Sequence, residues 1–160
     1  MSAPFRRPAL VIGILAAALA LACSRRPGDP VEALLVELEG AAEARDAEAF
    51  GAWLSPQYRD EHGLDRAATI AQLRRWFAGY ETIALEVYGT EIDRSAAAAA
   101  RVRCVVEFSG QGRRVFGLEG LLPPSATYRF TLDFAEEAGA WRVRGAAYEP
   151  VLPAADTGGR

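Results

Sequence analysis

Residues 101–108 read RVRCVVEF, and every second side chain of this stretch is apolar. Successive side chains of a β-strand point to opposite faces of its sheet, so the alternation predicts a strand with one buried and one solvated face. Three further stretches alternate in the same way and predict three more strands: Ile83–Tyr88, Tyr128–Phe134 and Trp141–Arg144. Turn residues at 93–95 and 136–139 separate these strands, which predicts hairpins in an antiparallel sheet.

Upstream of the strands, apolar residues recur at helical spacing. Asp29, followed by a proline, can begin a first helix, because Asp is a good N-cap and Pro suits the first helical position. Asp46 can cap a second helix that ends at Ser55-Pro56, and Asp65 a third that ends at Gly79. Helices followed by a run of strands are typical of an α+β fold, with three N-terminal helices packed on one face of an antiparallel sheet.

Length and composition limit the classes of protein to which this chain can belong. The 160 residues suffice for a single domain with a core, and the hydrophobic share of 51% excludes a disordered chain. The net charge of -3 disfavours a nucleic-acid partner. Two cysteines and one histidine cannot build a zinc site of Cys and His alone, and no phosphate loop or nucleophile elbow occurs. We therefore expect no metal and no cofactor.

The N-terminus predicts a secretory leader. Arg6 and Arg7 precede an unbroken apolar run, Ala9–Ala22, which is too short to cross a bilayer. The predicted organisation is a signal peptide at 1–22, a lipidated tether at 23–29, the domain at 30–150 and a flexible tail at 151–160.

Leu19-Ala20-Leu21-Ala22-Cys23 resembles the lipobox of bacterial lipoproteins. The resemblance implies cleavage before Cys23, diacylation of its thiol and acylation of the new amino terminus, for example with palmitate. Two or three acyl chains give stable anchoring. Ser24 follows, and in the Gram-negative sorting rule a residue other than Asp favours the outer membrane. The expectation is a lipid anchor at the periplasmic face of the outer membrane. Ordinary signal cleavage with an incidental cysteine is the alternative.

Short strings in the predicted domain resemble the nuclear transport factor 2-like (NTF2-like, also cystatin-like or SnoaL-like) superfamily. They are Ala44-Arg45-Asp46, Ser55-Pro56-Gln57-Tyr58-Arg59-Asp60 and Trp141-Arg142-Val143. Gly117–Pro123, with Tyr128 and Glu149-Pro150, resembles a subset of uncharacterised bacterial lipoproteins of this fold. The resemblance covers residues 30–150 and implies a strongly bent, cone-shaped sheet around a cavity.

The superfamily includes isomerases and cyclases with an acid/base group in the cavity, and also binding and assembly modules without chemistry. Isomerase-type sites combine an Asp base with a Tyr and a protonated Asp, a trio that cannot be placed residue by residue here. We therefore expect a non-catalytic binding or accessory module for an apolar small molecule or an envelope protein. The alternative is a SnoaL-like isomerase or cyclase. Many relatives dimerise through the outer sheet face, and both monomer and dimer stay open.

Candidate acid/base residues lie in a predicted polar loop, residues 58–64, at the mouth of the cone. They are Tyr58, Asp60 and His62, and only the imidazole titrates ordinarily near neutral pH. A solvated loop, in which Asp60 or His62 caps nearby backbone, is the alternative.

Seven aromatic residues at apolar helix or strand positions could line the cavity, or form ordinary core: Trp53, Trp76, Tyr80, Phe108, Tyr128, Phe130 and Trp141. The long connection at 111–125 carries four apolar residues expected to fold over the cavity as a lid: Val115, Phe116, Leu121 and Leu122. Cys104 falls at an inward strand position and is expected to be a buried small hydrophobe.

The predicted outer face of the sheet is charged. It carries Arg101, Arg103, Arg129, Arg142 and Arg144 beside Glu86, Glu107 and Asp133. These arginines could pair across strands or bind an anionic envelope component.

Overall fold

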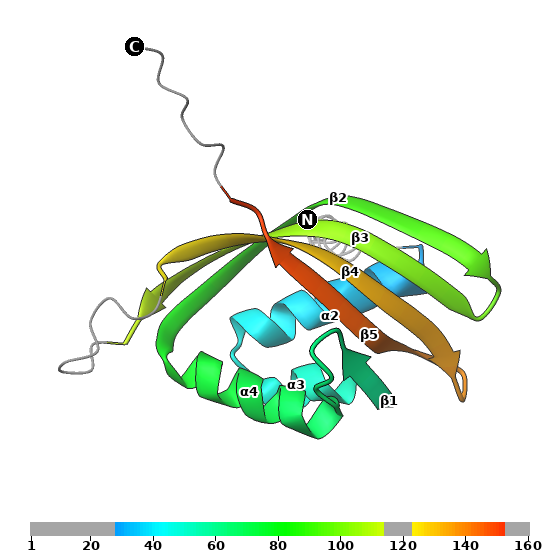
Figure 1. Cartoon of the computed structure of the whole chain (residues 1–160), viewed down its shortest axis with the longest axis horizontal. Helices are drawn as coiled ribbons and strands as arrows, with labels where there is room; N and C mark the ends of the chain where they lie inside the picture. Colours follow the sequence, from blue (N-terminus) through cyan, green and yellow to red (C-terminus); the bar gives the residue numbers. More distant parts are fainter. Residues whose placement is uncertain (1–27, 114–122, 153–160) are drawn as a thin grey trace, which may run out of the picture.

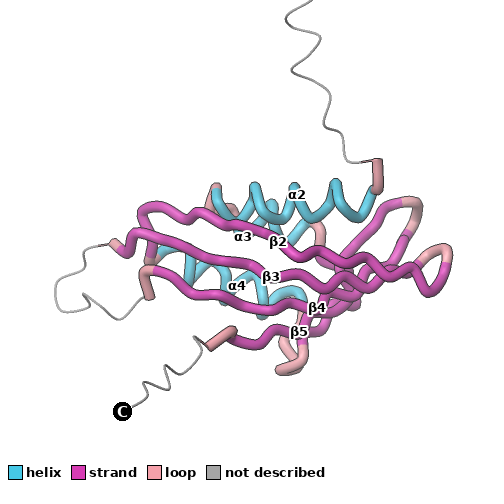
Figure 2. The backbone as a smooth tube through the Cα atoms, turned by 90° about the horizontal axis from the view of Figure 1, so that it is seen from above, coloured by secondary structure: helices cyan, strands magenta, loops and turns pink. Residues whose placement is uncertain are grey.

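The computed structural model describes residues 28–113 and 123–152. Within these ranges five strands form one curved sheet, and three helices cover its concave face (Figure 1). The helices are α2 (Pro30–Glu43), α3 (Ala47–Ala52) and α4 (Arg66–Ala78), and the strands are β1 (Leu54–Asp60), β2 (Tyr80–Ala96), β3 (Ala99–Gly112), β4 (Ser125–Glu137) and β5 (Ala140–Pro150). Figure 2 shows the helices together on one side of the sheet. The predicted α+β class, with N-terminal helices on a bent sheet, is confirmed.

Each helix begins at the aspartate that the sequence predicts. The caps are Asp29 for α2, Asp46 for α3 and Asp65 for α4. The N–H of Val31, for example, donates to Asp29 Oδ1 at 2.7 Å. Such bonds satisfy amides that a helix N-terminus leaves unpaired. Gly79 ends α4 as predicted, whereas α3 ends at Ala52, ahead of the predicted Ser55-Pro56. None of these described helices is long and apolar enough to cross a bilayer.

The largest departure from the prediction is β1, which occupies a stretch predicted as a helix end and a polar loop. β1 pairs in parallel with β5 at the edge of a sheet ordered β1-β5-β4-β3-β2. Pro56 is compatible with this position, because one side of an edge strand has no neighbour that needs its amides. The sheet is therefore mixed rather than purely antiparallel. Tyr58 lies in this strand and is only 5% exposed, so its placement in a solvated loop was wrong.

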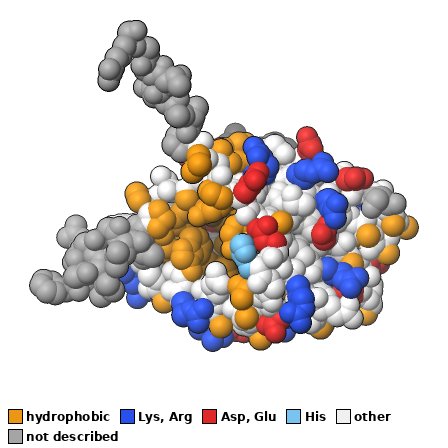
Figure 3. All heavy atoms as spheres, in the orientation of Figure 1, with side chains coloured by type: hydrophobic (Ala, Val, Ile, Leu, Met, Phe, Trp, Pro, Cys, Tyr) orange, Lys and Arg blue, Asp and Glu red, His pale blue; other side chains and the backbone are white. Residues whose placement is uncertain are grey.

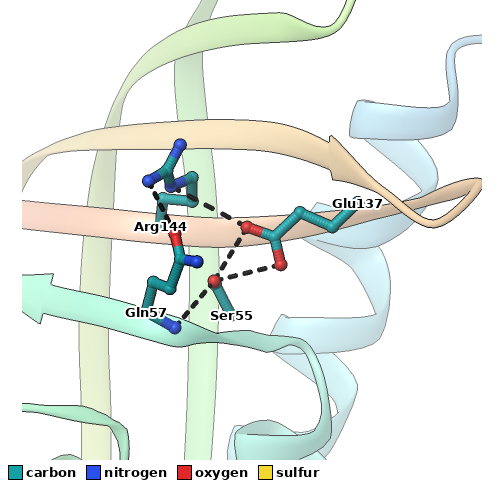
Figure 4. A network of polar contacts seen from close by, with 4 residues as sticks. All are labelled: Ser55, Gln57, Glu137 and Arg144. Carbon is teal, nitrogen blue, oxygen red and sulfur yellow. Dashed lines mark hydrogen bonds and ion pairs between the residues drawn. The ribbon is translucent and has the colours of Figure 1, made fainter.

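A polar network connects β1 to the hairpin of β4 and β5 (Figure 4). The Ser55 hydroxyl is 0% exposed and donates to the Glu137 carboxylate, with an oxygen–oxygen distance of 2.8 Å. It also accepts from the backbone N–H of Gln57 at 3.0 Å. The Gln57 side-chain oxygen accepts in turn from Arg144 Nη2 at 2.9 Å. The buried hydroxyl is thus satisfied, and the first strand is attached to the last.

The hairpin turns agree with the prediction in one case and differ in the other. β4 and β5 are joined at Ala138 and Gly139, both with positive φ, inside the predicted 136–139. The β2–β3 turn lies at 97–98 instead of 93–95, because the strands stay paired as far as Ala96 and Ala99. Asp93 faces Arg101 in this register, and the ladder with its opposite charges outweighs the local turn preference.

The core lies between α2 and the concave face of the sheet. Its buried members include Val31, Leu34 and Leu38 on α2 and Val102, Phe134 and Val143 on the strands. A second cluster, built on Phe77, Tyr80 and Phe108, lies beside α4. Burying each such aliphatic or aromatic side chain stabilises the fold by roughly 1.5–3 kcal/mol.

Three arginines of the outer face form ion pairs across strands, which is one of the two expectations for these arginines. The pairs join residues that face each other in the sheet register: Arg101–Asp133, Arg129–Glu149 and Arg103–Glu91. Glu86 and Glu107, also expected as partners, form no ion pair within the described ranges. Arg142 Nη1 donates to the Ala52 carbonyl oxygen at 2.6 Å instead.

Candidate functional site

Three half-buried aromatic rings gather on the concave side of the last two strands. Tyr128 and Phe130 belong to β4, and Tyr148 belongs to β5, directly opposite Phe130 in the register. The ring centroids lie 5.6 Å apart for Phe130–Tyr148 and 6.2 Å apart for both Tyr128–Phe130 and Tyr128–Tyr148. We refer to these three residues as the aromatic cluster. Since each ring keeps part of its surface exposed, the cluster offers a contact surface for an apolar molecule.

The chain's one histidine lies at the edge of the aromatic cluster. The His62 ring meets the Tyr148 ring edge-on, at 5.5 Å between centroids and 78° between planes. Its side chain is 59% exposed. Figure 3 shows hydrophobic side chains gathered beside the histidine on this face of the molecule.

Two tyrosine hydroxyls and two carboxylates surround the same place. Burial first, and the Asp60 carboxylate second, raise the pKa of Tyr58 to about 12. Burial also raises the pKa of Tyr148, and the Asp60 and Glu61 carboxylates add to this effect. Both phenols therefore stay protonated at neutral pH and can donate or accept hydrogen bonds. The buried Thr69 hydroxyl of α4 is a close neighbour of the Tyr58 hydroxyl, and its presence acts against the rise in the Tyr58 pKa.

The loop after β1 places these polar groups. Asp60 Oδ1 accepts from the backbone N–H groups of His62 at 2.9 Å and Leu64 at 2.7 Å, which closes the turn. Glu61 joins this turn to β5, because its Oε1 accepts from the Tyr148 N–H at 2.7 Å. The structure thus brings Tyr58, Asp60 and His62 together around Tyr148, with one Asp60 oxygen already engaged by the loop itself.

The seven aromatic residues predicted as a pocket lining do not form one site. Tyr128 and Phe130 belong to the aromatic cluster, whereas Trp76, Tyr80 and Phe108 pack on one another beside α4, with centroids 4.8–5.3 Å apart. Trp53 and Trp141 lie against the core under α2. Two of the seven therefore belong to the aromatic cluster. Tyr80 and Phe108 are buried in the core, and the three tryptophans are partly buried against it.

The sequence pattern does not predict Tyr148 as a site residue, because a β-bulge in β5 interrupts the alternation. Val143 faces Phe134, but Gly145 faces Asp133, so the β5 register shifts by one residue between them. A bulge of this kind reverses which side chains point inward. Strict alternation from Trp141 and Val143 places Tyr148 on the outer face, whereas the bulge turns it toward the aromatic cluster.

The remaining predicted sites divide between the core and residues outside the described ranges. Cys104 is buried, and burial raises the pKa of its thiol. Among the described residues no group of three or more His, Cys, Asp or Glu side chains could hold a metal ion. Residues 1–22, Cys23 and most of the tether, the four lid residues, and 153–160 of the tail lie outside the described ranges.

Comparisons with known proteins establish the fold. No family model matches the sequence, and no curated protein matches it. Solved structures do match. A proposed scytalone dehydratase from Novosphingobium aromaticivorans has a TM-score of 0.66 at 12% identity, covering 87% of this chain and 89% of that one.

Two further solved structures agree in fold. An uncharacterised protein with a cystatin-like fold from Caulobacter vibrioides gives a TM-score of 0.63 at 18% identity, covering 78% of this chain and 89% of that one. A proposed dehydratase of the NTF2-like family from Streptomyces avermitilis gives 0.64 at 18% identity, with 78% and 96% covered. At these identities the likeness concerns the fold and not the activity.

Proposed function

Because this chain has the NTF2-like, cystatin-like fold, we propose that it is a binding module that holds an apolar small molecule against the aromatic cluster. The observation that carries this proposal is the set of three partly exposed rings, Tyr128, Phe130 and Tyr148, on the concave face. Partly exposed aromatic rings bordered by a few polar groups are typical of small-molecule sites.

The polar groups around the cluster favour orientation of a ligand over its conversion. With a pKa of about 12, the Tyr58 phenol is a neutral hydrogen-bonding group at physiological pH, not a base. Asp60 uses one carboxylate oxygen to close its own loop. The Asp60 and Glu61 carboxylates beside Tyr148 disfavour an anionic ligand. The proposed ligand is therefore an uncharged apolar molecule.

A small-molecule isomerase or cyclase that uses Asp60 and His62 is the second candidate. It is favoured by one observation, that both residues lie at the rim of the aromatic cluster beside the Tyr148 ring. In that case the His62 imidazole would move a proton to or from a bound molecule.

One experiment separates the two functions. The full chain, purified from its own cells in a neutral detergent, is analysed by native mass spectrometry for a retained molecule. Binding is then measured with the neutral fluorophore N-phenyl-1-naphthylamine. Phe130→Ala should weaken binding about tenfold, the loss of about 1.4 kcal/mol of contact. Tyr88→Ala, an exposed tyrosine on β2, is the matched control and should leave binding unchanged.

The outcome for His62 decides between binding and catalysis. If the protein is a binding module, wild type and His62→Ala both bind the probe and leave the retained molecule unchanged. If it is an enzyme, wild type converts the retained molecule, whereas His62→Ala binds it without converting it. Equal binding by wild type and Phe130→Ala would contradict the site itself.

We further propose that the protein is a lipoprotein of the outer membrane, anchored through Cys23 and facing the periplasm. The support is the lipobox-like Leu19–Cys23 and the Ser24 that follows it. Cys23→Ser should move the protein from the membrane fraction to the soluble periplasm, or leave an uncleaved precursor, whereas Cys104→Ala should stay in the membrane fraction. A wild-type mass equal to that of the unmodified chain would contradict the anchor.

A further inference from the structure

A second feature lies at the C-terminal end of α4 and shares no residue with the aromatic cluster. An open depression of about 550 Å³ forms where α2 ends, α3 begins and β3 passes the end of α4. Three arginines contribute to its lining: Arg45, Arg74 and Arg113. Among the described residues, the acids of its lining are Asp46 and Glu48.

Two of these arginines converge on one oxygen atom. Arg45 Nη1 and Arg113 Nε both donate to the backbone carbonyl oxygen of Tyr80, at 2.8 Å and 3.3 Å. Their guanidinium groups therefore lie side by side, and an anion bound beside them would relieve the repulsion between the two like charges. Within the described ranges neither Arg45 nor Arg113 has a carboxylate oxygen within 4.0 Å.

The acids of the depression are already engaged elsewhere. Asp46 Oδ1 accepts from the backbone N–H groups of Glu48 and Ala49 as the cap of α3. The Glu48 carboxylate pairs with Arg74. Neither Arg45 nor Arg113 therefore forms an ion pair in the part of the chain that the structure describes, although the Asp46 carboxylate lines the same depression.

The backbone of Arg45 shows that an arginine is unexpected at this position. α2 ends in a Schellman motif, in which the Asp46 N–H donates to the Ala41 oxygen and the Arg45 N–H to the Ala42 oxygen. Arg45 occupies the left-handed position of this motif, with φ of 58°. Glycine is the residue that suits this conformation, and residues held in it against their preference cluster at functional sites.

From the convergent pair we propose that Arg45 and Arg113 form a binding site for a phosphate group. Each guanidinium keeps donors beyond the one used on Tyr80, and planar arginine forks match the oxygens of a phosphate. A bridging phosphate would neutralise both charges. The same chemistry belongs to a free phosphate monoester and to the headgroup of an anionic phospholipid.

The test measures thermal unfolding of the full chain, in a neutral detergent at constant ionic strength, with two soluble probes. Inorganic phosphate represents the free monoester, and glycerophosphoglycerol represents the phospholipid headgroup. With a probe at ten times its Kd, the ratio of folded to unfolded protein should rise about elevenfold, which raises Tm by a few degrees.

The variants are chosen so that the fold survives. Arg45→Gly removes one guanidinium and its hydrogen bond to Tyr80, and the glycine placed at a positive φ offsets part of that loss, so the fold should survive. Arg113→Gln removes the other guanidinium. Arg75→Gln, an exposed arginine of α4 outside the depression, is the matched control. Phosphate also stabilises proteins by exclusion from their surface, but this effect is common to all variants.

We expect wild type and Arg75→Gln to respond to a probe, and Arg45→Gly and Arg113→Gln to lose most of that response. A response to phosphate assigns the site to a free phosphate group, and a response to glycerophosphoglycerol alone assigns it to a headgroup. The proposal is overturned if all variants respond equally to both probes, or if none responds.

Discussion

Replacing Ser55 by alanine removes the centre of the network that attaches β1 to the rest of the sheet. The Ser55 hydroxyl donates to the Glu137 carboxylate at 2.8 Å and accepts from the Gln57 N–H at 3.0 Å. A hydrogen bond to a charged group contributes about 1.5–3 kcal/mol, and a buried amide left without a partner costs about 1–3 kcal/mol. The Glu137 side chain is 27% exposed, so water can replace part of what is lost. We therefore expect Ser55→Ala to lower the free energy of unfolding by about 2–3 kcal/mol.

Urea unfolding, followed by circular dichroism, measures this loss. Ser109→Ala, an exposed serine on β3, is the matched control and should change stability by less than about 0.5 kcal/mol. The slope with urea should stay the same in both variants, because the folded surface does not change. If the two substitutions lower stability equally, the network contributes nothing and the account of how β1 is held is wrong.

Two further predictions concern buried titratable groups. The folded-state pKa of Tyr58, about 12, exceeds its ordinary value of 10.0, so its contribution to stability is complete below pH 10 and is lost as pH rises toward 12. Urea unfolding below pH 10 and again near pH 12 should show wild type losing about 2–3 kcal/mol more than Tyr58→Phe, and parallel losses would refute the shift. The Cys104 thiol is buried with a raised pKa, so a thiol reagent should modify it only after unfolding by urea. Rapid modification of the native protein would contradict its burial.

The sequence predicts the helices well, because their starts are set by local chemistry. Asp29, Asp46 and Asp65 each bond amides two or three residues away, and such short-range contacts are visible in a single sequence. The long strands are predicted for a similar reason, since alternation reports directly which residues face the core. The buried Val102 and Cys104 follow this pattern.

β1 could not be predicted in this way, because its partner is distant. Residues 54–60 have no clear alternation, and a strand forms there only because β5 offers a free edge beside it. Tyr148 escaped prediction for a different reason, namely the bulge between Val143 and Gly145 that reverses the alternation. The predicted groups at the site were found by residue type alone, and their grouping around Tyr148 depends on both of these non-local features.

The parallel pairing of β1 with β5 also determines the order in which the chain can fold. β2, β3, β4 and β5 pair with neighbours in sequence, whereas Leu54 must meet Val143, beyond every other strand. Closing so long a loop costs more entropy and slows folding. As the chain leaves the ribosome, its helices emerge with apolar faces before β2, β3, β4 and β5, the strands that cover them. β5 is the last strand to be synthesised, and β1, the first, pairs with it. A chain shortened ahead of β5 therefore leaves Leu54 without its partner in the sheet.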